Sequence, residues 1–358
     1  MKRIMIMDCT MRDGGWVNEF DFGTDGMRDI LKTEEGAGIE FIELGYLDQN
    51  KGYYRDKTMY ANYEALEDGF AGVRRSEGTT RLVMIDCGKF DAEKLPKHVP
   101  GDTAVIDGIR LCFHKKDTEK AISFGKKLLD RGFRLFVQPM VTSRYSDDDI
   151  KKLIETVQDE LKGFEAFYIV DSFGVLHEKE ICERLLLADA YLEQDIMLGL
   201  HTHNNLNLCM EDAKGACALA QTGESERPSR ERNMLHPDRR LILDATLDGL
   251  GKGPGNLVTE EIASYLNETF DNNYDLNRLN ALSARLIKPL RNSFEWGYAP
   301  EYELSSRYAA TPTYARIFCR EYKRSLQELE VFFKNMSENK KDSFDRKFAE
   351  EYLRKLKH

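Results

Sequence analysis

Two histidines in the segment HTHNNLNL, residues 201–208, are the residues whose type and spacing first suggest chemistry. His201 and His203 stand two residues apart at what we expect to be the end of a β-strand, so their imidazoles project from the same face. Such a pair binds a cation or transfers protons. Because buried, hydrogen-bonded H-x-H pairs are also common, the pair alone leaves metal binding and a structural role equally open.

The elements around this pair decide which side chains can act with it. Eight short apolar runs of strand type recur through the first 250 residues, and every gap between them has room for a helix. Alternating strands and helices predict a parallel sheet, and eight such units are typical of an α/β fold, the (β/α)8 TIM barrel. A doubly wound open sheet is the alternative, but it would carry a glycine-rich turn after its first strand, where this chain has MRDGGW. The runs begin at Arg3, Phe41, Leu82, Gly108, Arg134, Ala166, Ile196 and Leu241.

The strand pattern ends near residue 270. Residues 1–270 are therefore predicted to form a TIM-barrel catalytic domain, and residues 271–358 a helical C-terminal extension that caps the barrel or contacts another subunit. A homo-oligomer is left open. The polar, arginine-rich stretch 222–240 precedes the eighth strand, on the face opposite the active site of such barrels, so we expect its His236 to be non-catalytic.

Composition narrows the choice of partners. The net charge is −10 and the basic residues are scattered, which argues against a nucleic acid or an anionic membrane and favours a small-molecule substrate. No apolar run is long enough to span a membrane, and the start MKRIMIMDC has no long apolar signal region, so we expect a cytoplasmic protein. The seven cysteines include no C-x-x-C pair and are expected to be reduced thiols.

In a barrel of this kind the chemistry sits at the carboxyl ends of the strands. Strands 7, 8 and 1 become neighbours when the barrel closes, which brings His201 and His203 close to Asp13 and Asn256 across nearly 250 residues of sequence. Two imidazoles with a carboxylate are a common ligand set for a divalent cation with open positions. Taken singly, RDGG could be a turn and GLGKGPGN a tight loop. The order of these two segments and the histidine pair around a barrel favours a metal site.

Three segments in this order, DCTMRDG, HTHNNLNL and DGLGKGPGN, resemble the signature of the metal-dependent aldolase, lyase and synthase superfamily, the HMG-CoA lyase-like TIM barrels. The resemblance implies that Asp13, His201 and His203 bind a divalent metal, with Asn256 as a further ligand or a group beside them. It also implies that Arg12 stabilises enolate charge, since a guanidinium and a cation aimed at one oxygen favour the enolate. The expected metal is Mn²⁺ or Mg²⁺, and two imidazoles also allow Zn²⁺.

Within this superfamily the details most resemble 4-hydroxy-2-oxovalerate aldolase. The glycine-rich loop lacks the cysteine of the lyase, and VDSFG resembles the segment that holds the pyruvate carboxylate, which nominates Ser172. Trp16 departs from the pattern, because the aldolase has its proton-transferring histidine there and an indole N–H only donates. His114, after the fourth strand, is the substitute base, with an inert loop histidine as the equal alternative. Glu43 is expected to orient Arg12 or water at the substrate, and Trp16 to shape the pocket for a different acceptor.

These residues predict a divalent-metal-dependent aldolase that makes or cleaves a carbon–carbon bond next to a 2-oxo acid of pyruvate type, with an aldehyde as the second substrate. A Claisen-type synthase joining an acyl-CoA to a 2-oxo acid is one alternative, and the missing RDG-x-Q glutamine counts against it. A barrel that binds metal and ligand without catalysis is the other, and Trp16 is its best support. The sequence fixes neither the acceptor nor a dehydrogenase partner.

Overall fold

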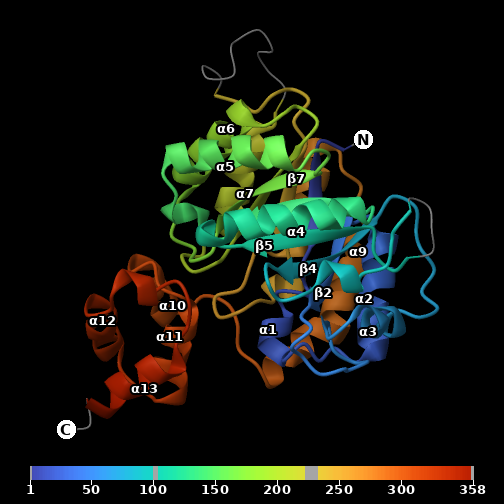
Figure 1. Ribbon diagram of the computed structural model, residues 1–358. Helices are drawn as coiled ribbons and strands as arrows, with labels where there is room; N and C mark the ends of the chain where they lie inside the picture. Colours follow the sequence, from blue (N-terminus) through green and yellow to red (C-terminus); the bar gives the residue numbers. More distant parts are fainter. Residues whose placement is uncertain (1, 100–103, 222–232, 356–358) are drawn as a thin grey trace.

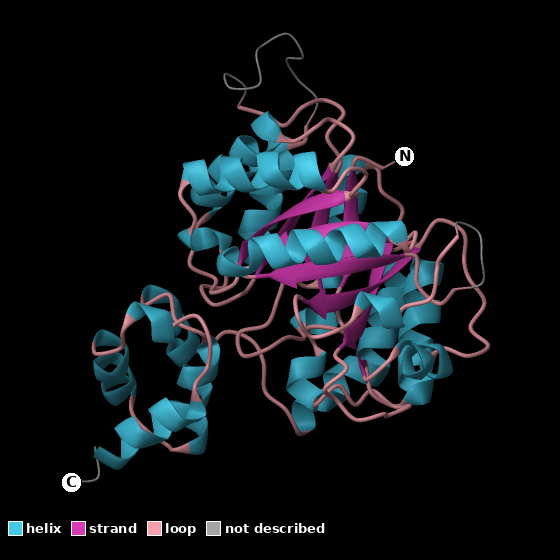
Figure 2. Cartoon of the chain, in the orientation of Figure 1, coloured by secondary structure: helices cyan, strands magenta, loops and turns pink. Residues whose placement is uncertain are grey.

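The computed structural model describes residues 2–99, 104–221 and 233–355. Its centre is a closed barrel of parallel strands, in which β1 pairs with both β9 and β2 and so joins the two ends of the sheet. The predicted TIM barrel with additional C-terminal helices is confirmed (Figures 1 and 2). A short strand, β3, adds to the outer end of β2. The strands are β1 Ile4–Asp8, β2 Phe41–Leu47, β3 Met59–Tyr60, β4 Thr80–Asp86, β5 Gly108–Phe113, β6 Arg134–Pro139, β7 Ala166–Asp171, β8 Met197–Thr202 and β9 Leu241–Ala245.

Side-chain caps mark the start of two of the helices that cover the barrel, α3 and α5. Ser146 starts α5 with a capping box, in which its hydroxyl accepts from the Asp149 N–H and the Asp149 carboxylate accepts from the Ser146 N–H. The apolar residues of α5 then recur at helical spacing and are buried against the strands. The α-helices of the described chain are α1 Gly15–Asn18, α2 Thr24–Ala37, α3 Tyr63–Gly69, α4 Thr118–Asp130, α5 Asp147–Glu160, α6 Glu178–Tyr191, α7 Cys209–Leu219, α8 Thr259–Phe270, α9 Leu276–Leu282, α10 Pro300–Arg307, α11 Pro312–Arg316, α12 Leu326–Lys334 and α13 Arg346–Lys355.

The expectation of a helix in every gap is wrong for the gap between β4 and β5. The described residues of this segment contain only the three-residue 3-10 helix η1, Ala92–Lys94. The segment carries Gly88, whose φ of +87° lies outside the helical region, and Pro96, which lacks the N–H that a helix needs. Phe90 and Leu95 are buried and cover the strands in place of a helix.

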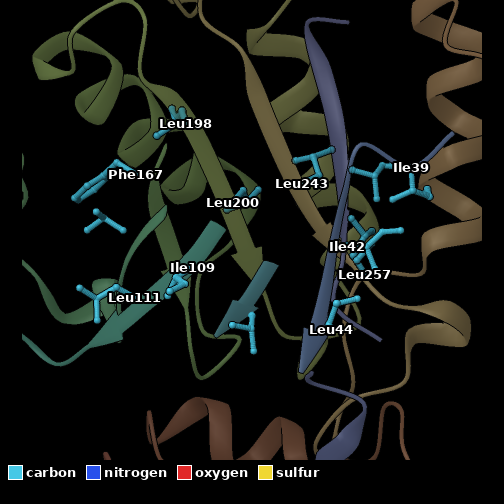
Figure 3. Packing of buried hydrophobic residues seen from close by; sticks show 14 of the residues in the cluster. Ile39, Ile42, Leu44, Ile109, Leu111, Phe167, Leu198, Leu200, Leu243 and Leu257 are labelled. Carbon is cyan, nitrogen blue, oxygen red and sulfur yellow. The ribbon is translucent and has the colours of Figure 1, made fainter. Parts of the chain in front are cut away.

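Two apolar layers hold the barrel together. One fills its interior and includes Met5, Phe136 and Tyr168. The other lies between strands and helices, where Leu198 and Leu243 point away from the barrel axis (Figure 3). The barrel is therefore a packed core whose open positions lie at the ends of its strands.

The C-terminal helices divide between two cores. Helix α9 and the following residues as far as Trp296 pack into the barrel's outer layer. From Tyr302 to Leu353 a second, separate apolar core holds α10 to α13 together. The domain boundary at residue 270 stays a prediction. None of the described helices is long and apolar enough to cross a membrane.

The second core sits over the carboxyl ends of the strands. Ser306 donates a hydrogen bond to the Gly174 carbonyl, which follows β7, at 2.6 Å. Arg144, which follows β6, contacts the Asp342 carboxylate at 2.6 Å and donates to the Ala309 carbonyl at 2.6 Å. The red helices of Figure 1, α10 to α13, thus contact the loops that follow β6 and β7.

Candidate metal and substrate site

The three predicted ligands lie together at the carboxyl ends of β1 and β8. The Asp13 Oδ2 atom is 4.0 Å from the Nε2 atom of His201 and 3.8 Å from that of His203. One ligand atom from each residue lies within 4.8 Å of the others, the only such acid, histidine or cysteine group among the described residues. Asp13 and His201 are buried, and His203 is partly exposed.

Neighbouring groups fix the orientation of both imidazoles. The His203 Nδ1 donates to the Asp171 carbonyl at 3.0 Å, so its Nε2 lone pair faces Asp13. The His201 Nδ1 lies 2.9 Å from the carboxylate of Asp244 on β9, which turns its Nε2 the same way. Metal-binding histidines usually donate their second nitrogen to a carboxylate or carbonyl in this manner.

A divalent cation fits this donor set. Burial lowers the pKa of His203 to about 4, with the neighbouring His201 adding to the effect and Asp13 opposing it. At neutral pH, Asp13 therefore faces an unprotonated Nε2 of His203. Ligand atoms that share one ion at about 2.0–2.2 Å lie roughly 3–4 Å apart, close to the separations here. The geometry needs only a small contraction to hold a metal.

Asn256 reaches the same point from the glycine-rich loop, residues 248–256. Its backbone forms an antiparallel bridge with His203, and the Asn204 N–H donates to the Gly255 carbonyl at 2.9 Å. Gly255 has φ +78°, and a Cβ there would lie 2.3 Å from the Gly249 carbonyl oxygen. The Asn256 amide donates to Asp13 at 2.7 Å, and its buried Oδ1 has no hydrogen-bond partner among the described residues. An amide oxygen without a protein partner can bind a cation, and Asn256 as a further ligand stays a prediction.

Two acidic residues hold the Arg12 guanidinium, and one of its nitrogens, Nη2, has no partner in the described chain. Its Nε donates to Glu43 at 2.6 Å, and its Nη1 lies 3.2 Å from Asp13. The buried Nη2 has no hydrogen-bond partner in the described chain, although Arg12 lines the cavity beside Asp13. A substrate oxygen could accept from Nη2, which agrees with the role that the family resemblance implies for Arg12.

A buried ionic chain lies beneath the ligands. Glu43 is within 3.2 Å of Arg110, a fully buried residue of β5, and Arg110 donates to Asp244 at 3.0 Å. Asp244 in turn contacts His201. The chain thus connects the Arg12 side of the site to the metal side, and it fixes both groups before any substrate binds.

A cavity of about 200 Å³, which we call the mouth cavity, opens above these groups. The β-bulge after Glu43, where Gly45 has φ +134°, turns Tyr46 so that it lines this cavity. The C-terminal extension supplies Thr311, Pro312 and Asp342 as part of its wall. The barrel and the extension therefore form the site together.

His114 and Ser172 both line the mouth cavity. Ser172 accepts a hydrogen bond from the Val141 N–H at 3.0 Å, which leaves its own proton free to be donated. Burial lowers the pKa of His114, helped by Lys116 and opposed by Asp342. A neutral imidazole at the cavity wall has the form that a base requires.

The structure separates two predicted substrate residues from the cavity. Glu43 is fully buried below Arg12 and does not line the cavity, so its contacts are those of a residue that orients Arg12. Trp16 is 47% exposed and stacks edge-on against Phe20 and Tyr46, outside the mouth cavity. It lines two neighbouring surface grooves instead.

Other residues of the site were missed by sequence reasoning. Arg110 and Asp244 are charged residues inside apolar strand runs, a signal that could have marked them. Lys252 is the one charged residue of GLGKGPGN, and it lines the mouth cavity. Tyr46 and Asp342 carried no signal, because their positions depend on the bulge in β2 and on the docking of the extension.

His236 lies at the opposite end of the barrel. Its carbonyl accepts from Arg3, the residue before β1, at 3.0 Å, and its N–H donates to Asp189 at 2.9 Å. The prediction that it is not catalytic agrees with this position. Residues 222–232 of the polar stretch lie outside the described residues.

Known proteins resemble this chain in sequence and in fold. No protein-family model matches the chain. It is 22% identical over 293 residues to a 4-hydroxy-2-oxovalerate aldolase from Geobacillus genomosp. 3, covering 81% of this chain and 78% of that protein. It is 23% identical over 275 residues to an oxaloacetate decarboxylase from Mycobacterium tuberculosis, covering 73% and 69%. The solved N-terminal domain of an aldolase-like protein from Bacteroides vulgatus has a TM-score of 0.70 at 22% identity, covering 90% of this chain and 99% of that one.

Proposed function

We propose that this chain is a metal-dependent enzyme that makes or cleaves a carbon–carbon bond next to a 2-oxo acid of pyruvate type. The premise is that the chain belongs to the TIM-barrel superfamily that contains the 4-hydroxy-2-oxovalerate aldolases and oxaloacetate decarboxylase. The observation that carries this proposal is the cluster of Asp13, His201 and His203 beside the free edge of Arg12. Its groups suit one task, the stabilisation of negative charge on a substrate oxygen.

Each residue of the site has a separate role in this proposal. A cation held by Asp13, His201 and His203, with Asn256 as a further ligand, would act as a Lewis acid toward the keto oxygen. Arg12 donates from its free Nη2 to the same oxygen as charge develops there. Ser172 donates its hydroxyl proton to the carboxylate of the oxo acid. Mn²⁺ or Mg²⁺ suits the oxygen-rich substrate, and the two imidazoles also accommodate Zn²⁺.

His114 is the base in this proposal. It removes or returns the proton at the carbon or hydroxyl that reacts, since Trp16 cannot do so and faces a different groove. Its pKa lies below the ordinary histidine value, so it is neutral at neutral pH and free to take a proton. Asp342, from the extension, is an acid whose charge favours the protonated imidazole once it forms.

Decarboxylation is a second candidate, and the oxaloacetate decarboxylase among the relatives favours it. Loss of carbon dioxide from oxaloacetate and retro-aldol cleavage of a 4-hydroxy-2-oxo acid both produce the enolate of pyruvate. The same oxygen receives the charge in both reactions, so Arg12 and the metal ligands serve either. What differs is the group that leaves.

The first test follows deuterium exchange at the methyl group of pyruvate by NMR, with Mn²⁺ or Mg²⁺ added. Exchange requires only enolate formation, so it is independent of the acceptor. We expect metal-dependent exchange in the wild type and its loss in Asp13→Ala. Asp238→Ala, an exposed acid far from the site with an 81% exposed side chain, is the matched control and should retain it.

Wild-type protein that binds the metal without any exchange contradicts the pyruvate proposal. In that case thiol release from acetyl-CoA with a 2-oxo acid tests the Claisen synthase. If that is absent too, the non-catalytic barrel remains. Where exchange occurs, release of carbon dioxide from oxaloacetate separates the decarboxylase from the aldolase.

A further inference from the structure

Lys252 stands at the border between the mouth cavity and a second hollow. It lines both. The second hollow, the lateral groove, has a volume of about 700 Å³ and lies between the glycine-rich loop and the C-terminal extension. Trp16, Phe294 and Arg316 are among its other lining residues. A molecule too long for the mouth cavity would therefore pass Lys252 as it extends into the groove.

The ammonium group of Lys252 differs from the other cations of the lateral groove in having no acidic partner. Within the described chain, no carboxylate forms an ion pair with it, and its nearest recorded partner is the Trp16 ring, with 5.5 Å between Nζ and the ring centroid. The groove arginines Arg316, Arg320 and Arg346 pair with glutamates at 3.0, 2.7 and 3.2 Å respectively. Lys252 is thus the cation of this groove that is free to bind a ligand.

Asp13 is the acid whose charge acts on Lys252, but its oxygens are already used. Oδ1 lies 3.2 Å from Arg12, and Oδ2 accepts from Asn256 at 2.7 Å. Burial lowers the pKa of Lys252, with Asp13 opposing and Arg316 adding to the shift. The Lys252 side chain is only partly buried, so an anion that enters the groove can reach the ammonium group and pair with it.

We propose that Lys252 binds an anionic group, a carboxylate or a phosphate, carried by the acceptor aldehyde of the reaction. The inference rests on the proposed function, because it needs an acceptor. The mouth cavity holds the small oxo acid beside Arg12 and Ser172, so the distal end of a longer acceptor must leave it. Lys252 lies on that path, because it lines both the mouth cavity and the lateral groove.

The test measures kcat/KM for matched pairs of aldehydes with pyruvate as donor. Succinate semialdehyde against pentanal tests a carboxylate, and glyceraldehyde 3-phosphate against glyceraldehyde tests a phosphate. In Lys252→Met we expect a loss of at least tenfold with the anionic member of one pair, a change under twofold with its neutral member, and unchanged pyruvate exchange. Lys252→Arg should restore most of the loss. Arg346→Met, a groove cation already paired with glutamates, is the matched control.

Several results would overturn the assignment. Equal losses with charged and neutral aldehydes, equal losses in Arg346→Met, or loss of pyruvate exchange in Lys252→Met would each assign another role to Lys252. If the wild type exchanges pyruvate but turns over no aldehyde, the affinities of wild type and Lys252→Met for succinate semialdehyde and glyceraldehyde 3-phosphate are compared by calorimetric titration. Equal affinities in the two proteins contradict the inference. Absence of exchange in the wild type marks failure of the proposed function instead.

Discussion

Replacing Asp244 by asparagine tests whether the groups beneath the ligands control the metal site. The Asp244 side chain is 1% exposed and lies 2.9 Å from the Nδ1 of His201. It also accepts from Arg110 at 3.0 Å. Asparagine keeps the shape of the side chain but removes its charge, so His201 loses the carboxylate that orients it and raises its basicity.

The expected magnitude follows from these two contacts. Loss of a carboxylate behind a metal-binding histidine weakens metal affinity about 10–100-fold, or about 1.4–2.7 kcal/mol. Arg110 loses one of its two carboxylates and keeps Glu43 at 3.2 Å, so the free energy of unfolding should fall by about 2–4 kcal/mol. Both effects should appear in the same variant.

The assay is calorimetric titration with Mn²⁺, combined with thermal unfolding of the metal-free protein. Asp189→Asn is the matched control, because Asp189 accepts from the buried Arg239 at 2.7 Å at the opposite end of the barrel. We expect it to lose stability while its affinity for Mn²⁺ stays at the wild-type value. An Mn²⁺ affinity of Asp244→Asn equal to that of the wild type, or an equal loss of Mn²⁺ affinity in both variants, would refute the reasoning.

Two further predictions concern protons. His114→Gln should lower the rate of pyruvate exchange roughly 10²–10⁴-fold at unchanged Mn²⁺ affinity. In the wild type, the exchange rate should fall at acid pH with a midpoint below the ordinary histidine pKa, since burial lowers the pKa of His114. An unchanged rate in the variant would assign the base to another residue. Burial raises the pKa of Asp212 to about 8, with Asp171 adding to it. As pH rises from 3 to 8, the unfolded chain releases this proton before the folded chain does, so wild-type stability should fall progressively relative to Asp212→Asn, by about 0.5 kcal/mol at pH 4 and by at most about 5 kcal/mol at pH 8. Thermal unfolding of both proteins across this pH range checks the prediction. A stability difference between them that does not change with pH would contradict the prediction.

The candidate metal ligands could be predicted from the sequence, because the histidine pair follows from strand periodicity and the other two residues follow from the order of the strands. Residues i and i+2 of a strand share a face, so the pairing of His201 with His203 followed from their spacing alone. The order of eight strands implied a barrel, and closure of a barrel makes the first and last strands neighbours. The strand order therefore places Asp13 and Asn256 beside the histidines.

The rest of the site depends on how elements distant in sequence pack together, which no local pattern encodes. The contacts of Glu43, Arg110 and Asp244 across the barrel follow from the stagger of the strands, and the position of Tyr46 follows from one bulge. Whether Lys252 meets a carboxylate depends on every chain segment around it. The sequence alone thus determined the fold and the ligand types, because these arise from periodicity and strand order. Only the tertiary structure decided which charges are paired and which are free, because ion pairs form between side chains that three-dimensional packing brings within a few ångströms.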